Sequence, residues 1–456
     1  MIDYARLKFY GLDHYNIDPE TSFEVSSDTL PYHTIVIHFI KDRNTYCPNC
    51  GSFNYISRGS KSSELRFSTR SESNVRLKIY KRIFRCKDCN KEFREENPFT
   101  HGNKTITIQM ELAMLNDIRN NEALAFNKIA EKYGVSNTFL NDLFDKKVDL
   151  KRLPLPDVLS IDEVHAKKLS KTKFCCVLYD FMNRQIVDIL DCRHKNFLID
   201  YLSRIPKKER NNVKFVSMDM WDTYRDVSKL CFPDAIIVCD SFHVIQKMGR
   251  DYTHLRVRIQ SRFDKQDHTK LYYKLIKKYS SYLNMDESKL KYGYITVGLL
   301  NGAQMTRRQL IEYILKLDDE LRVAYELRQE YFSFNSTATI NNAAEWLDEL
   351  IFKFASSNIR ECEDFAGTLR DWHDEIINSF IKYQGVRVNN GRIERKNESI
   401  KTIFRVGFGL SNFTRTRNRV MFTLNPRSPI LYTRKKENNN RRFKKRGPYK
   451  KKKEIK

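Results

Sequence analysis

Three acidic residues occupy positions where a carboxylate needs a partner. Asp162 lies in an apolar run that indicates a strand, LSIDEVH, and Asp219 ends a second such run, VKFVSMDM. Glu394 follows much later, on a helix that begins after the turn letters NNG. Acidic side chains at the end of a hydrophobic strand are rarely left without a neutralising group. These three carboxylates are therefore candidate ligands for a cation.

The chemistry available to such a set depends on whether the first two acids are neighbours. If the two strands lie side by side, Asp162 and Asp219 repel each other, and one takes up a proton unless a cation neutralises the pair. Mg²⁺ or Mn²⁺ prefers oxygen ligands, including carboxylates and substrate phosphates. With Glu394, the set could hold two ions, one activating the attacking oxygen and one stabilising the leaving oxygen of a phosphodiester. Taken singly, an acid of this kind is more often a helix cap or an ion-pair partner, so the hypothesis depends on all three acids sharing one pocket.

Four of the ten cysteines form two close pairs, Cys47 with Cys50 in CPNC and Cys86 with Cys89 in CKDC. The sequence between the pairs alternates apolar and polar residues, which is typical of strands. Two such pairs joined by β-rich sequence predict a zinc ribbon with one structural Zn²⁺. A redox role for either pair is the alternative. The other six cysteines are scattered through apolar runs, as reduced, buried cysteines are.

Residues 105–146 change to a helical period. One helix over ITIQMELAMLNDIRN is followed by a shorter helix, a break at the letters GV, and a second short helix capped by Ser136. The apolar spacing lets the two short helices bury a shared face, which predicts a helix-turn-helix. Its second helix would present Asn137, Thr138 and Asn141 to a DNA groove. A plain helical hairpin is the alternative.

The remaining chain predicts a larger α/β core. After the linker LPLPD come three strand-like runs, a helix, a fourth strand, a helix and a fifth strand, which together indicate a mixed five-stranded sheet with helical crossovers. Long helical patterns then indicate an all-α insertion. The fold class is multidomain α+β. We expect the following domains: zinc ribbon 1–100, helix-turn-helix 101–152, first part of the core 153–245, helical insertion 246–383, last part of the core with the Glu394 helix 384–430, and a basic disordered tail 431–456.

The formal net charge of +25 indicates a polyanionic partner. From Arg434 onward the tail alone holds 13 Lys or Arg and two Glu. A positive field of this size attracts nucleic acid, and a solubilising tail is the alternative reading. No run of about 18 apolar residues indicates a membrane span, and the first residues lack the core of a signal peptide. We therefore expect a cytoplasmic protein without a membrane partner.

Four blocks, LSIDEVHAKK, VSMDMWDTY, VCDSFHVIQKM and NNGRIERKNESIK, resemble those of bacterial insertion-sequence transposases of the DDE type. The similar family is the ISL-three family, which has a zinc-ribbon N-terminus, and the resemblance extends from the first cysteine pair to about residue 425. It implies a ribonuclease-H-like core with a helical insertion, and a catalytic triad of Asp162, Asp219 and Glu394. Asp240 and His243 fall in a block whose histidine supports the site or the insertion. By spacing alone Asp240 rivals Asp219, which we prefer because the fourth strand abuts the first in this fold.

The resemblance also implies a reaction. A DNA transposase would cleave phosphodiesters at the insertion-sequence ends with two metal ions, then join the freed 3′-OH to target DNA. The ribbon and helix-turn-helix would bind the terminal inverted repeats, and Lys396, Lys401 and Arg405 would contact the backbone near the cut. Synapsis of two ends predicts a homodimer or larger assembly on double-stranded DNA, in the bacterial nucleoid. The alternative is a DNA-binding regulator or an inactive transposase descendant.

Two tryptophans of the expected insertion, Trp346 and Trp372, admit two interpretations. They could stack on flipped bases, or they could pack in the helical core.

Overall fold

The computed structural model describes residues 1–25, 32–40, 45–67, 75–100, 105–166, 169, 172–263, 269–407 and 412–431. Contacts divide the chain into two compact units, the first comprising 1–150, 406–408 and 418–456, and the second 151–405 and 409–417. The expected tail lies outside the described residues from 432 onward. Among the described helices, none combines the length and apolar character needed to cross a membrane.

The first unit begins with helix α1 (Tyr4–Phe9) and a five-stranded sheet. Four strands run in the order β1-β2-β4-β3, and β5 pairs with β4. The long strands β3 and β4 pair antiparallel, and the first part of β3 is largely exposed. The strand bounds are β1 Phe23–Val25, β2 His33–His38, β3 Tyr55–Phe67, β4 Val75–Cys86 and β5 Glu92–Arg94.

Three helices of the first unit confirm the predicted helix-turn-helix pattern. Helix α2 (Ile108–Asn120) precedes α3 (Phe126–Lys132) and α4 (Asn137–Lys147). The turn between α3 and α4 contains Gly134 at φ +60°, and the Ser136 hydroxyl caps α4 by accepting a hydrogen bond from the backbone N–H of Phe139 at 3.1 Å. The cap satisfies one of the free N–H groups at the start of the helix, as predicted.

The last described helix, α17 (Phe413–Leu424), contributes its residues from Asn418 onward to the first unit. Asn418 donates to the Val148 carbonyl at 3.0 Å, and the Phe422 ring packs against Phe144 with 5.8 Å between ring centroids. The expected core segment 384–430 is therefore divided, because the side chains at the end of α17 pack on the N-terminal helices.

The second unit contains the predicted mixed five-stranded sheet, in the order β10-β9-β6-β7-β8. Strands β10, β9 and β6 run parallel to one another. Strands β6, β7 and β8 form an antiparallel meander. Helix α5 and the short α6 connect β8 to β9, and α7 connects β9 to β10. The bounds are β6 Val158–His165, β7 Phe174–Asp180, β8 Gln185–Leu190, α5 Lys195–Ser203, α6 Lys207–Arg210, β9 Phe215–Met218, α7 Asp222–Cys231 and β10 Ile236–Cys239.

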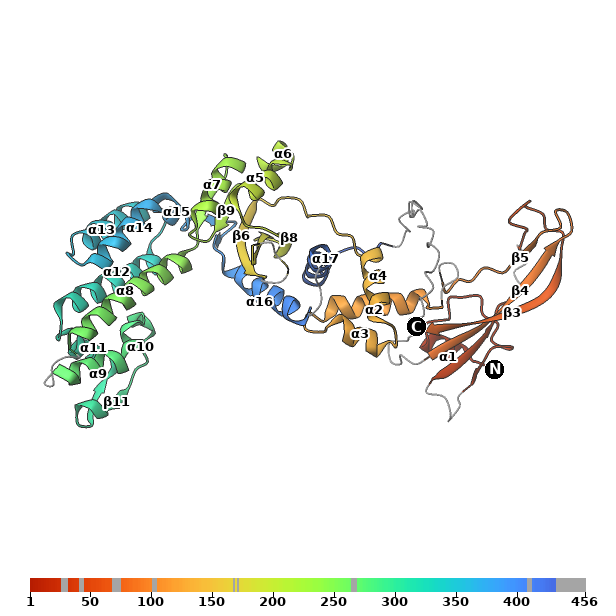
Figure 1. Ribbon diagram of the computed structural model, residues 1–456, viewed down its shortest axis with the longest axis horizontal. Helices are drawn as coiled ribbons and strands as arrows, with labels where there is room; N and C mark the ends of the chain where they lie inside the picture. Colours follow the sequence, from red (N-terminus) through yellow and green to blue (C-terminus); the bar gives the residue numbers. More distant parts are fainter. Residues whose placement is uncertain are drawn as a thin grey trace, which may run out of the picture. The chain divides into compact units, whose positions relative to one another are not determined.

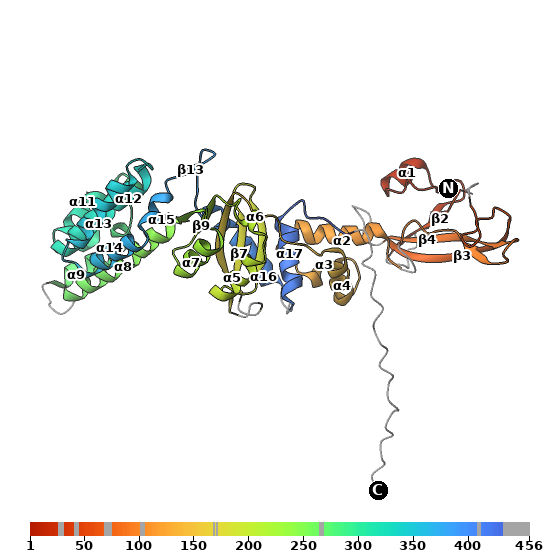
Figure 2. The same ribbon diagram turned by 90° about the horizontal axis from the view of Figure 1, so that it is seen from above.

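Alternate residues of these strands pack on opposite faces of the sheet, as the period of two requires. Leu159 and Ile161 of β6 belong to the large core that α5 and α7 complete (Figure 2). Val158 belongs to a second core with Val388, from the segment that returns to the sheet after the insertion. Both faces of β6 are therefore covered, which explains its almost continuous apolar sequence.

The segment between β10 and the last core helix α16 (Gly391–Val406) is mainly helical. Helix α8 runs from the sheet, and α9, α10, α11 and β11 gather at its far end (Figure 1). The bounds are α8 Ser241–Phe263, α9 Lys270–Lys278, α10 Ser280–Leu283, η2 Glu287–Lys289, β11 Tyr294–Val297, η3 Gly298–Leu300, β12 Ala303–Thr306, α11 Arg307–Leu315, α12 Asp319–Thr337, α13 Ala343–Ala355, α14 Arg360–Asp371, α15 His373–Asn378, β13 Lys382–Tyr383 and β14 Val386–Arg387.

The expected insertion, 246–383, is not all-α, since it contains β11 and β12 and ends in the two-residue strand β13. Strands β11 and β12 pair antiparallel as a hairpin. The loop ends at Asn301 and Gly302, with φ of 52° and 78°. Asn-Gly is a strong hairpin signal because both residues tolerate positive φ, and the flanking Tyr, Ile, Thr and Val favour strands.

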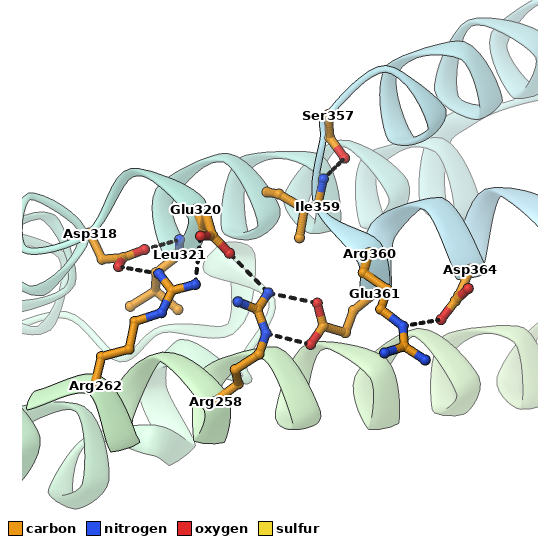
Figure 3. A network of polar contacts seen from close by, with 10 residues as sticks. All are labelled: Arg258, Arg262, Asp318, Glu320, Leu321, Ser357, Ile359, Arg360, Glu361 and Asp364. Carbon is orange, nitrogen blue, oxygen red and sulfur yellow. Dashed lines mark hydrogen bonds and ion pairs between the residues drawn. The ribbon is translucent and has the colours of Figure 1, made fainter. Parts of the chain in front are cut away.

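Arginines of α8 join three helices of the insertion (Figure 3). Arg258 donates two hydrogen bonds to Glu361 of α14, at 2.9 and 2.8 Å, and also pairs with Glu320 of α12 at 2.9 Å. Arg262 pairs with the same Glu320 at 2.7 Å. A guanidinium that binds one carboxylate through two nitrogens is held in a fixed orientation. The network therefore fixes α12 and α14 against α8.

We expect Arg258→Met to lower the stability of this unit by about 1 kcal/mol, since the pairs are partly exposed and water screens them. This would lower the melting temperature by about 2–4 °C. The matched control is Arg360→Met, because Arg360 makes only a 4.0 Å pair with Asp364 within one helix. Thermal denaturation at low and high salt measures both variants, and equal shifts in the two would contradict a bridging role for Arg258.

Candidate active site

The acidic cluster forms where three neighbouring strands bring corresponding residues together. Ile161 of β6 pairs with Met218 of β9, and Met218 pairs with Cys239 of β10. The next residues along the three strands are Asp162, Asp219 and Asp240. The predicted neighbourhood of the first and fourth strands is confirmed by this register. Because β9 is the middle strand, Asp219 lies between the other two aspartates.

Two donors converge on one oxygen of Asp219. His243, in the first turn of α8, lies with its Nε2 3.0 Å from Asp219 Oδ1. Asn390, immediately before α16, donates its Nδ2–H to the same oxygen at 3.0 Å. Asn390 is itself fully buried and accepts a hydrogen bond from the Ser217 hydroxyl at 2.6 Å. Oδ1 of Asp219 is thus held by two protein groups.

Asp162 is buried and receives donors at both oxygens. The backbone N–H of Glu163 donates to Oδ1 at 2.6 Å. The side-chain amide of Asn397, on α16, donates to Oδ2 at 2.6 Å. Asn397 is also buried. Two buried amides therefore contact the cluster, one for each of the two neighbouring carboxylates: Asn390 just before α16 and Asn397 within it.

The electrostatics of the cluster favour a bound proton or a bound cation. Burial, reinforced by the charge of Asp219, raises the pKa of Asp162 to about 8. Burial also raises the pKa of Asp240 to about 6, and the charges of Asp219 and Glu394 act in the same direction. For His243, burial lowers the pKa, but the hydrogen bond to Asp219 and the surrounding carboxylates outweigh burial and raise it. A divalent cation would remove the need for a proton on Asp162.

Asp240 has a structural role as well as a place in the cluster. It precedes α8, and its Oδ1 accepts a hydrogen bond from the Phe242 N–H at 3.3 Å, as an N-cap does. Its Oδ2 is buried and has no hydrogen-bond partner among the described residues. Donor atoms of Asp219, Asp240 and His243 all lie within 4.8 Å of one another. An unpartnered buried carboxylate oxygen is costly unless a proton or cation meets it.

The four paired cysteines form the second cluster, with donor atoms within 4.8 Å of one another. Cys47 Sγ lies 3.6 Å from Cys89 Sγ, and Cys50 Sγ lies 3.5 Å from Cys86 Sγ. Four zinc–sulfur bonds of about 2.3 Å in a tetrahedron separate the sulfurs by roughly 3.8 Å. The cysteine geometry therefore fits zinc.

The hairpin explains the long spacing between the cysteine pairs. Tyr55, just after the first pair, is the register partner of Cys86, so β3 and β4 return the chain to its starting point. Each pair is followed by a residue with positive φ, Gly51 at 74° and Asn90 at 58°, which closes the turn around the sulfurs. The backbone N–H of Lys91 lowers the pKa of Cys89 to about 6, which favours the thiolate.

The predicted DNA-contacting residues of α4 differ in exposure. Asn137 and Thr138 are exposed in its first turn. Asn141 is half-buried, and its Oδ1 is buried without a hydrogen-bond partner among the described residues. Only the first two present their side chains fully to solvent.

The three predicted cations of α16 do not share one face. At about 100° per residue, Lys401 and Arg405 lie on the same face as Glu394, whereas Lys396 lies about 200° away. Lys401 also pairs with Glu398 at 2.6 Å, and Arg405 is exposed. The face of α16 that carries Glu394 therefore also carries Lys401 and Arg405, which follow Glu394 along the helix.

The model of the ISL-three family of DDE transposases, described as "Transposase", matches residues 159–420. This match contains all the acids of the cluster and both asparagines. The chain belongs to this transposase family.

A solved structure titled "Drosophila P element transposase strand transfer complex" is similar at 12% identity and a TM-score of 0.38, covering 69% of this chain and 91% of that chain. No curated protein matches the sequence.

Two functional candidates of the transposase were missed from the sequence. Asn390 and Asn397 lie in a polar stretch, NNGRIERKN, in which nothing distinguishes a buried amide from an exposed one. The only signal in the sequence was their spacing from Glu394, because Asn390 is four residues before it and Asn397 three residues after it.

The tryptophans have a simpler role. Trp372 is buried in the core under the Arg225 guanidinium, 4.2 Å from the ring centroid, and Trp346 packs edge-on against Phe334.

We expect Cys86→Ser to abolish zinc binding, because it removes a fully buried thiolate from a set of four. Elemental analysis of the purified transposase should fall from one zinc per chain to near zero. Cys231→Ser is the control, since this buried cysteine lies in α7, outside the cluster. Zinc retained at full stoichiometry in Cys86→Ser would contradict the assignment.

Proposed function

We propose that this transposase binds the terminal inverted repeats of an insertion sequence, cleaves the DNA there, and joins the freed 3′-OH to target DNA. Asp162, Asp219 and Glu394 would hold Mg²⁺ or Mn²⁺, and Asp240 and His243 would support them. The observation that carries the proposal is the adjacent placement of Asp162 and Asp219 by strand register, with a buried amide, Asn397 or Asn390, donating to each. The reaction would take place on nucleoid DNA.

The side chains present fit a divalent cation site. His243 and Asn390 hold Oδ1 of Asp219, and Oδ2 would bind the cation. Glu394 lies on α16 close enough for its charge to act on Asp240, the aspartate next to Asp219. When bound, two ions would activate the attacking oxygen and stabilise the leaving oxygen. Membership of the transposase family supports divalent-metal chemistry, and we propose two ions per site.

The protein groups then position the DNA and the carboxylates. Asn390 and Asn397 fix the rotamers of Asp219 and Asp162, so that these side chains do not rearrange when the charge in the site changes. His243 prevents Asp219 from rotating away. Lys401 and Arg405 continue the face of α16 that carries Glu394, where they would contact phosphates beside the scissile bond.

DNA recognition would lie with the first unit. Asn137 and Thr138, at the exposed start of α4, would contact base edges, and the ribbon hairpin would contact the backbone. Since two transposon ends must meet before joining, we propose a homodimer or larger assembly on double-stranded DNA.

We expect Asp219→Asn to abolish Mg²⁺-dependent cleavage while leaving binding to the terminal repeats unchanged, because it removes the charge but keeps the size and the contact with His243. Asp240→Asn is the comparison, since an asparagine still caps α8. If Asp219 is the second ligand of the triad, Asp219→Asn should reduce cleavage by at least about 10³-fold, and Asp240→Asn by clearly less.

The assay uses labelled repeat ends, a target plasmid and Mg²⁺ or Mn²⁺. The opposite order of the two variants would assign the ligand role to Asp240. Wild-type protein that binds the ends but never cuts them would support the DNA-binding regulator instead.

We expect Asn397→Leu to weaken Mn²⁺ binding by about tenfold, because the Asp162 carboxylate loses the donor that orients it. Titration calorimetry measures this without any reaction. The control, Asn378→Leu, removes an amide hydrogen bond to the Ile237 carbonyl at 2.9 Å in the same unit but touches no acid of the cluster. Equal loss of Mn²⁺ affinity in both variants would mean that Asn397 acts only through general stability.

A further inference from the structure

The helical insertion is divided into two parts of opposite charge. Residues 269–309, called here the tip, contain eight Lys or Arg and two acids. Residues 310–380, called here the body, contain six Lys or Arg and 15 acids. The tip gathers at the end of α8 away from the sheet (Figure 1). Charged residues that served only solubility would be mixed along the insertion and would not be divided into a basic and an acidic part.

Within the described part of the chain, most cations of the tip have no acidic partner. Asp286 and Glu287 pair with Lys289 and Arg308, at 4.0 and 2.8 Å. Among the described residues, no acid lies within ion-pair distance of the other six tip cations, which are Lys270, Lys274, Lys277, Lys278, Lys291 and Arg307. By contrast, Arg258 and Arg262 pair with acids of the body. Unpaired cations concentrated on one lobe are suited to phosphates.

Two tyrosines project from the same lobe. Tyr292 is fully exposed, at 102% of its reference area, and Tyr294 is 71% exposed. They flank Gly293 at the start of β11, next to Lys291, whose carbonyl accepts a hydrogen bond from Arg307 at 3.0 Å. Rings this exposed contribute nothing to the core. Aromatic faces among cations are the usual platform for unpaired bases.

We propose that the tip is a second DNA-contacting surface of the transposase, which binds phosphates through its lysines and stacks unpaired bases on Tyr292 and Tyr294. The inference deepens the proposed function and rests on it for the choice of DNA as the polyanion. An acidic protein surface, including the body of a second copy, would satisfy the lysines. It would not explain two exposed aromatic rings, and several acids of the body are already paired with arginines of α8 and α12.

The test compares the full-length transposase with two variants. Tyr292→Ala/Tyr294→Ala removes the rings, and Lys274→Gln/Lys277→Gln/Lys278→Gln removes three exposed charges of α9. The probes are a fluorescent 20-base-pair duplex and the same duplex with a five-nucleotide 3′ overhang, titrated at several KCl concentrations. Tyr313→Ala/Lys316→Gln is the matched control, because both residues are exposed but lie outside the tip.

We expect the tyrosine variant to lose about fivefold or more in affinity for the overhang DNA and less than about twofold for the blunt duplex. The lysine variant should reduce the slope of log affinity against log salt by about 2 for both probes. The control should match the wild type. Bromodeoxyuridine in the overhang should photo-crosslink to Tyr292 or Tyr294 in the wild type.

Unchanged affinities and salt slopes in both variants would overturn the proposal. So would self-association of the wild type that the lysine variant abolishes while DNA binding stays the same, since the partner would then be a second copy. A cleavage assay on the wild type, run in parallel, separates the two proposals. Overhang binding at the tip without cleavage would remove the proposed reaction and keep this surface, whereas cleavage with an inert tip would do the reverse.

Discussion

The mutual repulsion of carboxylates at corresponding positions of three adjacent strands is the constraint around which the second unit is arranged. Register alone brings Asp162, Asp219 and Asp240 together, and burial strengthens their repulsion because water is excluded. The protein offsets part of this cost with donors from outside the sheet, His243 on α8 and the amides of Asn390 and Asn397 around α16. The raised pKa values of Asp162 and Asp240 show that the offset is incomplete. A site left partly uncompensated in this way retains affinity for a cation.

These donors come from the two points where the insertion joins the core. Helix α8 begins immediately after Asp240, and α16 begins immediately after Asn390. Residues of the cluster that are more than 170 positions apart in sequence, such as Asp219 and Asn390, therefore meet because the insertion leaves and re-enters the sheet at one place. The entropy of closing a loop grows only slowly with its length, so a folded insertion of this size is tolerated there. Val388 shares a small apolar core with Phe181 and Phe215, and this packing holds the returning segment against the sheet.

The sequence predicts the strands and their acids well because each strand is a short apolar run, with Asp162 inside β6 and with Asp219 and Asp240 directly after β9 and β10. The helix-turn-helix is equally readable, since Ser136 is a cap and Gly134 a break. Three features could not be read. The amides of Asn390 and Asn397 look like surface residues in the sequence, although each donates to a carboxylate of the cluster in the fold. The β11–β12 hairpin is hidden among helices despite its Asn-Gly turn.

The third feature is the packing of α17. Its sequence, FTRTRNRVMFTL, contains three arginines, and one of them, Arg419, is fully buried. Burial lowers the pKa of Arg419 to about 10, and its guanidinium lies 4.8 Å from the Phe126 ring centroid. A cation–π contact and a hydrogen bond to the Leu124 carbonyl at 2.5 Å replace part of its hydration. Patterns of polarity cannot anticipate such compensation, because it depends on partners from a segment about 290 residues earlier.

The distribution of charge also explains why the net charge alone does not locate the DNA. The total of +25 includes a body of the insertion in which acids outnumber cations by more than two to one. Those acids do structural work by pairing with Arg258 and Arg262, and the same excess of negative charge repels phosphates from α12 to α14. Of the cations of the tip and the body that lack an acidic partner among the described residues, most lie in the tip. The acids around each lysine and arginine, as well as the total charge of the chain, therefore bear on where a phosphate can bind.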